Sequence, residues 1–229
     1  MVCRIAALDG ATRSRVLTNR LVNIKRPRGA ASPAAILQAA AHEFALRGYD
    51  AAGVDRIAAK ARVNKAMLYY HYGSKLKLYL AVLRDMFVAV GARTRAIADG
   101  PEPADAKIDA WIAALVEEAS ARPWFPPIML RELASGAAHI DSDTFGVMNG
   151  VFLSVRDVIA QGQREGTFRP ADPLLTYPSI LPPILIFFAR QRVAQRKDAQ
   201  GLAAAAPLDV NAFVRHMQAA ARGMLRREP

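Results

Sequence analysis

The chain has 229 residues, 52% of them hydrophobic, and it carries 31 basic and 20 acidic side chains, a formal net charge of +11. This apolar content is enough for a buried core and excludes a chain that is disordered throughout. The single cysteine, Cys3, excludes a disulfide framework and a zinc site built on paired thiolates. The longest apolar run, residues 180–189, is well short of the ~20 residues that cross a bilayer, so we expect no membrane span.

The positive charge is concentrated near the N-terminus. Residues 1–30 carry a net charge of +6 and residues 31–85 a net charge of +4, which leaves +1 for residues 86–229. A basic block followed by a nearly neutral body is typical of a nucleic-acid-binding head joined to a separate module. Basic side chains that only solvate helix surfaces would give the same totals, so motifs have to decide between these interpretations.

Residues 1–30 have no sustained helical periodicity and include Arg26 and Arg28 close to their end. They also lack the long apolar stretch of a secretory signal. We interpret residues 1–30 as a basic, mobile arm, or in part as residues that precede the native start.

The first predicted helix opens with Ser32 as its N-cap and Pro33 at its first position. Apolar residues then recur every three or four positions as far as Phe44, and Gly48 is the kind of residue that ends a helix. Shorter helices are predicted over residues 54–61 and 65–72.

The two short helices have the dimensions of a helix-turn-helix motif. Ala58 is small enough to let them cross closely, and Val63 and Leu68 can fill the gap between them. Asn64 is a good N-cap for the second helix, and Ser74 for a longer helix with an apolar stripe that follows.

Helical patterns continue to the C-terminus, and we find no alternating strand pattern, so the predicted fold class is all-α. We expect a break or kink at Pro182 and Pro183, since proline removes a helical hydrogen bond. The predicted segments beyond residue 100 are 108–119, 126–135, 145–163, 174–177, 184–193 and 210–225.

The helix over residues 65–72 can read DNA if its N-terminal residues face base edges in the major groove. A lysine there can reach guanine acceptors or a phosphate, small apolar side chains can contact thymine methyl groups, and Tyr or His can hydrogen bond phosphates. Each side chain also has a plainer interpretation: Tyr72 is more typical of a core residue, Tyr69 of a half-buried one, and the lysines of a solvated surface.

The stretch from Ile36 to Phe87, and above all the run LYYHYGSK over residues 68–75, resembles the DNA-binding domain of the TetR family of bacterial transcriptional regulators. The resemblance implies an N-terminal three-helix helix-turn-helix domain over residues 31–78 and a helical-bundle ligand-binding and dimerisation domain over residues 79–229. The DNA contacts that it implies fall on Lys65, Ala66, Met67, Tyr69, Tyr70, His71 and Lys75, with Arg26 and Arg28 in the basic arm.

Three residues depart from the family pattern. Arg62 occupies the turn where a glycine is usual, which costs about 1 kcal/mol if its φ is positive. Gly53 stands where a Thr or Ser often caps the second helix. Asp55 puts a negative charge near the side expected to face DNA.

Residues 86–229 contain no nucleophile–base motif, no glycine-rich phosphate loop and no metal-ligand spacing, so we expect neither an enzyme nor a metal or other cofactor. Their bulky apolar side chains can line a pocket for a small hydrophobic effector, although any single one is more often a core residue. The candidate effector-binding residues are Trp111, Trp124, Phe125, Met129, Phe145, Met148 and Phe152.

The last two predicted helices are apolar on more than one face, and a two-fold partner would cover them. The resemblance implies a cytoplasmic homodimer that represses transcription from a palindromic double-stranded DNA operator and is released by a small apolar effector. The alternatives are a DNA-binding structural or interaction protein without an effector, an enzyme in the body, and a membrane-surface protein that uses the basic arm.

Overall fold

The computed structural model describes residues 32–194 and 209–227, without the side chains of residues 191–194. The predicted basic arm, with Arg26 and Arg28, lies outside the described residues. Within them the secondary structure is helical apart from an isolated antiparallel bridge between Phe168 and Arg226. The helices are α1 (Pro33–Ala51), α2 (Val54–Ala61), α3 (Lys65–Tyr72), α4 (Lys75–Asp99), α5 (Ala104–Ala121), α6 (Phe125–Ala134), α7 (Ser142–Arg164), α8 (Pro173–Ala194) and α9 (Val210–Leu225).

The predicted helix starts in the N-terminal region are confirmed by their capping hydrogen bonds. The side chain of Ser32 accepts from the Ala35 N–H, that of Asn64 from the Met67 N–H, and that of Ser74 from the Lys77 N–H. Each cap satisfies a backbone donor that has no partner within its own helix.

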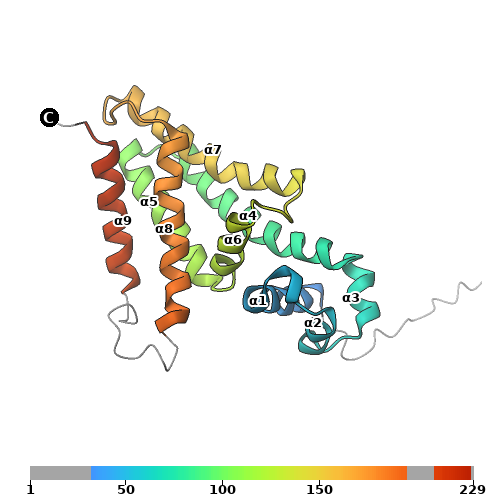
Figure 1. The fold of residues 1–229 in the computed structure, drawn as a ribbon. Helices are drawn as coiled ribbons and strands as arrows, with labels where there is room; N and C mark the ends of the chain where they lie inside the picture. Colours follow the sequence, from blue (N-terminus) through green and yellow to red (C-terminus); the bar gives the residue numbers. More distant parts are fainter. Residues whose placement is uncertain (1–31, 195–208, 228–229) are drawn as a thin grey trace, which may run out of the picture. The chain divides into compact units, whose positions relative to one another are not determined.

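Helices α1, α2 and α3 form a small head around one end of α4 (Figure 1). Leu68 is fully buried and Ala58 is 5% exposed, while Val63 is half-buried in the turn between α2 and α3. These three residues lie where the helix-turn-helix interpretation puts them. Tyr72 is half-buried, and its hydroxyl donates to the Pro33 carbonyl at 2.9 Å, tying α3 to the start of α1.

The turns of the head use two residues with a positive φ. Arg62 ends α2 with φ 57° and ψ 40°, so the non-glycine turn anticipated from the sequence is left-handed. Gly48 has φ 75°, and helical structure resumes after it, so α1 extends to Ala51 across a kink.

Helix α4 runs from the head into the body, where it packs against α5 and α7, and α8 and α9 lie side by side (Figure 1). Helix α8 runs unbroken through Pro182 and Pro183, so the separate helices predicted over residues 174–177 and 184–193 are wrong, while a kink at these prolines stays a prediction. The buried side chains of Ile180, Ile184 and Leu185 pack this helix into the bundle, and such packing can outweigh the missing helical hydrogen bonds.

Within the described residues, one stretch, Pro173–Arg190 of α8, is long and apolar enough to span a membrane by length and composition, and a third of it is buried. The same helix contacts α5, α6, α7 and α9. These contacts are what a core helix of a helical bundle makes.

The C-terminal end of α9 is fastened to the loop that follows α7. Phe168 is buried, and its ring lies so close to Gly162 that a Cβ atom at that glycine would be 2.2 Å from the ring. The Arg169 N–H donates to the Leu225 carbonyl at 2.8 Å. The absence of a side chain at residue 162 therefore lets this loop pack against α7.

Candidate nucleic-acid interface

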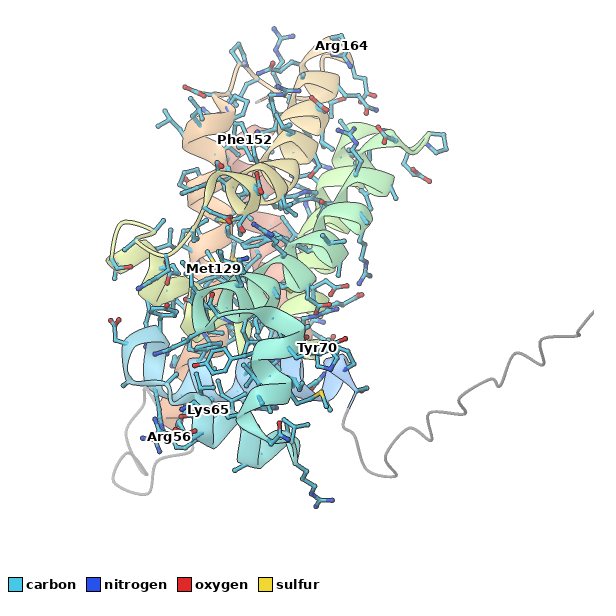
Figure 2. The ribbon with its side chains drawn as sticks, turned by 90° about the vertical axis from the view of Figure 1, so that its right-hand side faces the viewer. Arg56, Lys65, Tyr70, Met129, Phe152 and Arg164 are labelled. Carbon is cyan, nitrogen blue, oxygen red and sulfur yellow. The ribbon has the colours of Figure 1, made fainter. Side chains whose placement is uncertain are left out.

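Helix α3 has one face locked into the head and another face open to solvent. Leu68 and Tyr72 hold it against α1 and α2, as described above. On the other side Lys65, Ala66 and His71 are exposed, and Tyr70 is 82% exposed. Figure 2 shows Lys65 and Tyr70 at the same end of the molecule, far from Arg164 at the other end. A short helix fixed by its inner face and open along its outer face has the geometry needed to enter a DNA groove.

The aromatic side chains on the outer face of α3 are partly ordered by each other. The rings of Tyr70 and His71 lie edge to face with their centroids 5.3 Å apart. Tyr69 is 40% exposed and Met67 is half-buried, so both border the open face. Of the seven predicted DNA contacts in the head, six thus lie on or beside one face of α3.

Lys65 is paired with the acidic residue that departs from the family pattern. Its ammonium lies 3.1 Å from one carboxylate oxygen of Asp55 and 3.2 Å from the other. This hydrogen bond raises the pKa of Lys65 above its ordinary value, and the attraction to the carboxylate adds to the effect. Lys65 is therefore positively charged at neutral pH, and in this structure it forms an ion pair with a carboxylate.

The seventh predicted contact, Lys75, is turned toward α1. Its ammonium donates to the Asp50 carbonyl at 3.0 Å and lies 4.7 Å from the centroid of the Tyr49 ring. A cation over an aromatic face is an attractive arrangement. In this structure Lys75 ties the start of α4 to the end of α1.

Three other cations of the head were not predicted from the sequence to contact DNA. Lys60, Arg62 and Lys77 are exposed, and none of them has an ion-pair partner among the described residues. The concentration of charge in residues 31–85 was the signal for them, but the position of each one depends on the turn after α2 and on the start of α4.

Glu43 of α1 compensates for the missing cap at Gly53. Its carboxylate accepts from the Arg56 Nε at 2.5 Å and from the Gly53 N–H at 3.5 Å, and it lies 3.1 Å from the Nε of Arg47. Burial alone would raise the pKa of Glu43, but the hydrogen bonds from Arg56 and Gly53 outweigh it and leave the pKa lowered. The Glu43 carboxylate of α1 thus accepts a hydrogen bond from the backbone at the start of α2.

The body contains a cavity of about 120 Å³ between α4, α5, α6, α7 and α8. Three of the predicted effector-binding residues, Phe125, Met129 and Met148, line it. Other lining residues that the sequence did not single out include Met86, Val90, Leu115, Val151, Tyr177 and Ile184.

The other four predicted effector-binding residues lie outside the lining. The rings of Trp111 and Phe152 pack edge to face against Tyr177, which does line the cavity. Trp124 is buried with its ring against Phe125, and Phe145 is 47% exposed on α7. Helical periodicity identifies apolar residues, but it cannot tell a cavity wall from the layer behind it.

Helix α6 has the cavity on one side and the head on the other. Met129 and Leu133 line the cavity. Arg131 donates to the Ala45 carbonyl of α1 at 2.8 Å. Helix α6 therefore connects one wall of the cavity to α1.

Glu132 of α6 forms a buried polar cluster with Tyr79 of α4 and His139. The Tyr79 hydroxyl donates to the Glu132 carboxylate at 2.6 Å, and the Nδ1 of His139 lies 2.9 Å from the same oxygen. The His139 ring also packs against Tyr49 of α1, with centroids 4.2 Å apart. This cluster joins α1, α4 and α6 at the junction between head and body.

No group of three or more His, Cys, Asp or Glu side chains that could hold a metal ion occurs within residues 32–194 and 209–227.

Comparison with known proteins identifies the head. A family model described as "Bacterial regulatory proteins, tetR family" matches residues 36–82, which cover most of α1, all of α2 and α3, and the start of α4. The transcriptional repressor SCO4008 of Streptomyces coelicolor is 39% identical over 41% of this chain and 45% of its own length. The head is thus a DNA-binding domain of the TetR type. The transcriptional activator FasR of Mycolicibacterium smegmatis is 57% identical to this chain over 49 residues, which are 21% of the chain and 22% of FasR.

The chain therefore spans less than half the length of these two curated relatives. The agreement in fold extends further. The structure of the ketosteroid transcriptional regulator KstR2 of Mycobacterium tuberculosis superposes with a TM-score of 0.64 at 25% identity, covering 84% of this chain and 94% of that one. TetR-type architecture, with a helix-turn-helix head and a helical body, accounts for nearly all of the described residues.

Proposed function

We propose that this protein is a homodimeric repressor of the TetR family that binds a palindromic operator through α3 and releases it when a small apolar effector occupies the cavity of the body. The open face of α3, with Tyr70 82% exposed, is the observation that supports DNA binding most strongly. Packing against DNA would explain why such a large aromatic side chain is left mostly exposed in its own chain.

The charge of the head supports the same proposal. Lys60, Arg62 and Lys77 are exposed cations that lie near α3 in the chain. Contacts with phosphate supply affinity but little sequence preference, whereas base-edge contacts from Lys65, Ala66 and their neighbours would supply preference. We assign the first role to the three cations and the second to the N-terminal half of α3.

The dimer proposal rests on α8 and α9. Leu174, Leu175 and Ile186 of α8 are 67%, 72% and 55% exposed, a run of apolar surface that a second copy would cover. Phe213 of α9 stacks on the buried Phe187 of α8 with centroids 3.9 Å apart, which holds these two helices together. Two-fold pairing would present two α3 helices to the two halves of a palindrome.

Release by an effector follows from the two sides of α6. A molecule in the cavity presses on Met129 and Leu133, while Arg131 and Glu132 of the same helix hold α1 and α4. The effector has to bind the DNA-free arrangement better than the DNA-bound one, because equal affinities would shift nothing. The relatives include a named repressor and a named activator, and the proposal takes the repressor direction.

The test is DNA binding measured by fluorescence anisotropy, with DNA from upstream of the protein's own gene and a series of salt concentrations. The double variant Lys65→Ala/Tyr70→Ala should lose specific binding with its helix content intact. Lys60→Ala should weaken binding to all sequences and reduce the slope of log K against log salt by about 0.9. Arg164→Ala, an exposed cation at the opposite end of the molecule, is the matched control (Figure 2). Unchanged affinity in the double variant would remove α3 from the interface.

A further inference from the structure

The cavity of the body has an almost wholly apolar lining with one exception. Its walls are aliphatic, methionine and phenylalanine side chains from α4 to α8, and the exception is Tyr177 of α8. No charged side chain lies among the described residues that line it. Since an unpaired charge is very unfavourable in apolar surroundings, a carboxylate or ammonium group has no suitable place there.

The ring of Tyr177 is packed between two aromatic side chains, but its hydroxyl forms no hydrogen bond within the described residues. Its ring is packed edge to face between Phe152, at a centroid distance of 5.6 Å, and Trp111, at 6.3 Å. No group within the described part of the chain hydrogen bonds to its hydroxyl. By contrast, the buried Tyr79 and the half-buried Tyr72 both donate a hydrogen bond.

The state of the hydroxyl determines what it can bind. Burial raises the pKa of Tyr177 to about 12, so the group stays protonated at neutral pH and can donate. A ligand with an oxygen acceptor can take a hydrogen bond from this hydroxyl, at a net gain of about 1 kcal/mol. An apolar ligand without an acceptor gains nothing from it.

The volume limits the size of the ligand. A dry cavity of about 150 Å³ is known to hold benzene, so a cavity of about 120 Å³ limits the ligand to a compact molecule of about six non-hydrogen atoms.

We propose that the cavity takes a neutral, compact, mainly apolar molecule with one oxygen acceptor, which receives a hydrogen bond from the Tyr177 hydroxyl. This inference rests on the proposed effector site and specifies the chemical class of its ligand. Trp111 and Phe152 act through Tyr177 as positioning residues, since they fix its ring without lining the cavity.

The test compares two probes of nearly the same shape, cyclohexanone and methylenecyclohexane, with cyclohexanecarboxylate as the charged probe. Their affinities for the full chain without DNA are measured by calorimetry or ligand-observed NMR. Tyr177→Phe should weaken cyclohexanone binding about fivefold, the loss of one net hydrogen bond, and leave methylenecyclohexane binding unchanged or slightly stronger. The carboxylate should bind wild-type protein at least tenfold more weakly than the ketone.

Two further variants serve as controls, one away from the cavity and one that fills it. Tyr72→Phe removes a hydroxyl from the head and should leave the affinity of both neutral probes unchanged. Ala119→Leu fills the cavity from α5 and should abolish the binding of both. An equal loss of both neutral probes in Tyr177→Phe, tight carboxylate binding, or no binding of either neutral probe to folded wild-type protein would overturn the inference. Release of operator DNA by cyclohexanone is measured separately, and its failure would count against the proposed function alone.

Discussion

Removing the hydroxyl groups of three tyrosines one at a time should reduce stability by three different amounts, because the hydroxyls have different partners. The Tyr79 hydroxyl donates to the buried carboxylate of Glu132 at 2.6 Å. Hydrogen bonds to charged groups contribute roughly 1.5–3 kcal/mol, so Tyr79→Phe should lower the free energy of unfolding by about 2 kcal/mol. For a chain of this size that corresponds to a fall in Tm of about 4–8 °C.

The other two variants set the scale for this loss. The hydroxyl of Tyr72 donates to a neutral backbone carbonyl at 2.9 Å, so Tyr72→Phe should cost about 1 kcal/mol. The Tyr177 hydroxyl has no partner among the described residues, and Tyr177→Phe should therefore be within about 0.5 kcal/mol of wild type or slightly more stable.

Urea unfolding followed by far-ultraviolet circular dichroism, at one protein concentration for all variants, measures the series. A common m-value is needed for the comparison, since a changed m-value reports a changed unfolded or native state. The reasoning is refuted if Tyr177→Phe is as destabilising as Tyr79→Phe, because the partners seen in the structure would then not determine the losses.

Three further predictions concern other parts of the chain. Gly162→Ala should lower the free energy of unfolding by about 1–3 kcal/mol, because a Cβ atom at residue 162 would lie 2.2 Å from the Phe168 ring. An unchanged Tm of this variant in thermal unfolding would show that the packing is loose. Arg62→Gly should raise the free energy of unfolding by about 0.5–1 kcal/mol by relieving the left-handed strain at φ 57°, whereas Arg62→Ala keeps that strain; equal stabilities would contradict this account. Folding lowers the pKa of Glu43, so the stability that this carboxylate contributes is complete above the ordinary pKa of 4.5 and is lost as the pH falls through the lower pKa of the folded state. Glu43→Gln should therefore make the free energy of unfolding fall less steeply as the pH is lowered. An unchanged fall would exclude Glu43 as its cause.

Local signals in the sequence determine most of the head. Ser32, Asn64 and Ser74 cap the helices that they were expected to open, and Leu68 fills the gap between α2 and α3. Capping and close helix crossing depend on residues only a few positions apart in the chain. Such features can be predicted from the sequence alone.

Features that join distant residues were not predicted. Glu132 and Tyr79 are 53 residues apart, and nothing in the neighbourhood of either one indicates that a carboxylate would be buried against a phenol. Lys75 was expected to face a phosphate, but the carbonyl of Asp50 and the ring of Tyr49 lie within its reach once α1 is folded against α4. Tertiary contacts decide both cases.

The body shows the same limit in its cavity and in α8. Phe125, Met129 and Met148 were expected at a pocket and line one, while Trp111 and Phe152 stand one layer behind Tyr177. The periodicity of apolar residues shows which face of a helix is buried, but it does not show which of the buried side chains reach a cavity. The helix through Pro182 and Pro183 likewise depends on burial in the bundle, which local rules for proline do not include.

Photo-cross-linking from the middle of α3 tests the central claim most directly. The variant Tyr70→Cys in a Cys3→Ser background carries a photoactivatable thiol label, and Arg164→Cys in the same background carries the label at the far end of the body (Figure 2). With bound upstream DNA, the account predicts cross-links from position 70 to bases of one major groove in each half of a palindrome, and none from position 164. Cross-links from position 164 with none from position 70 would contradict it.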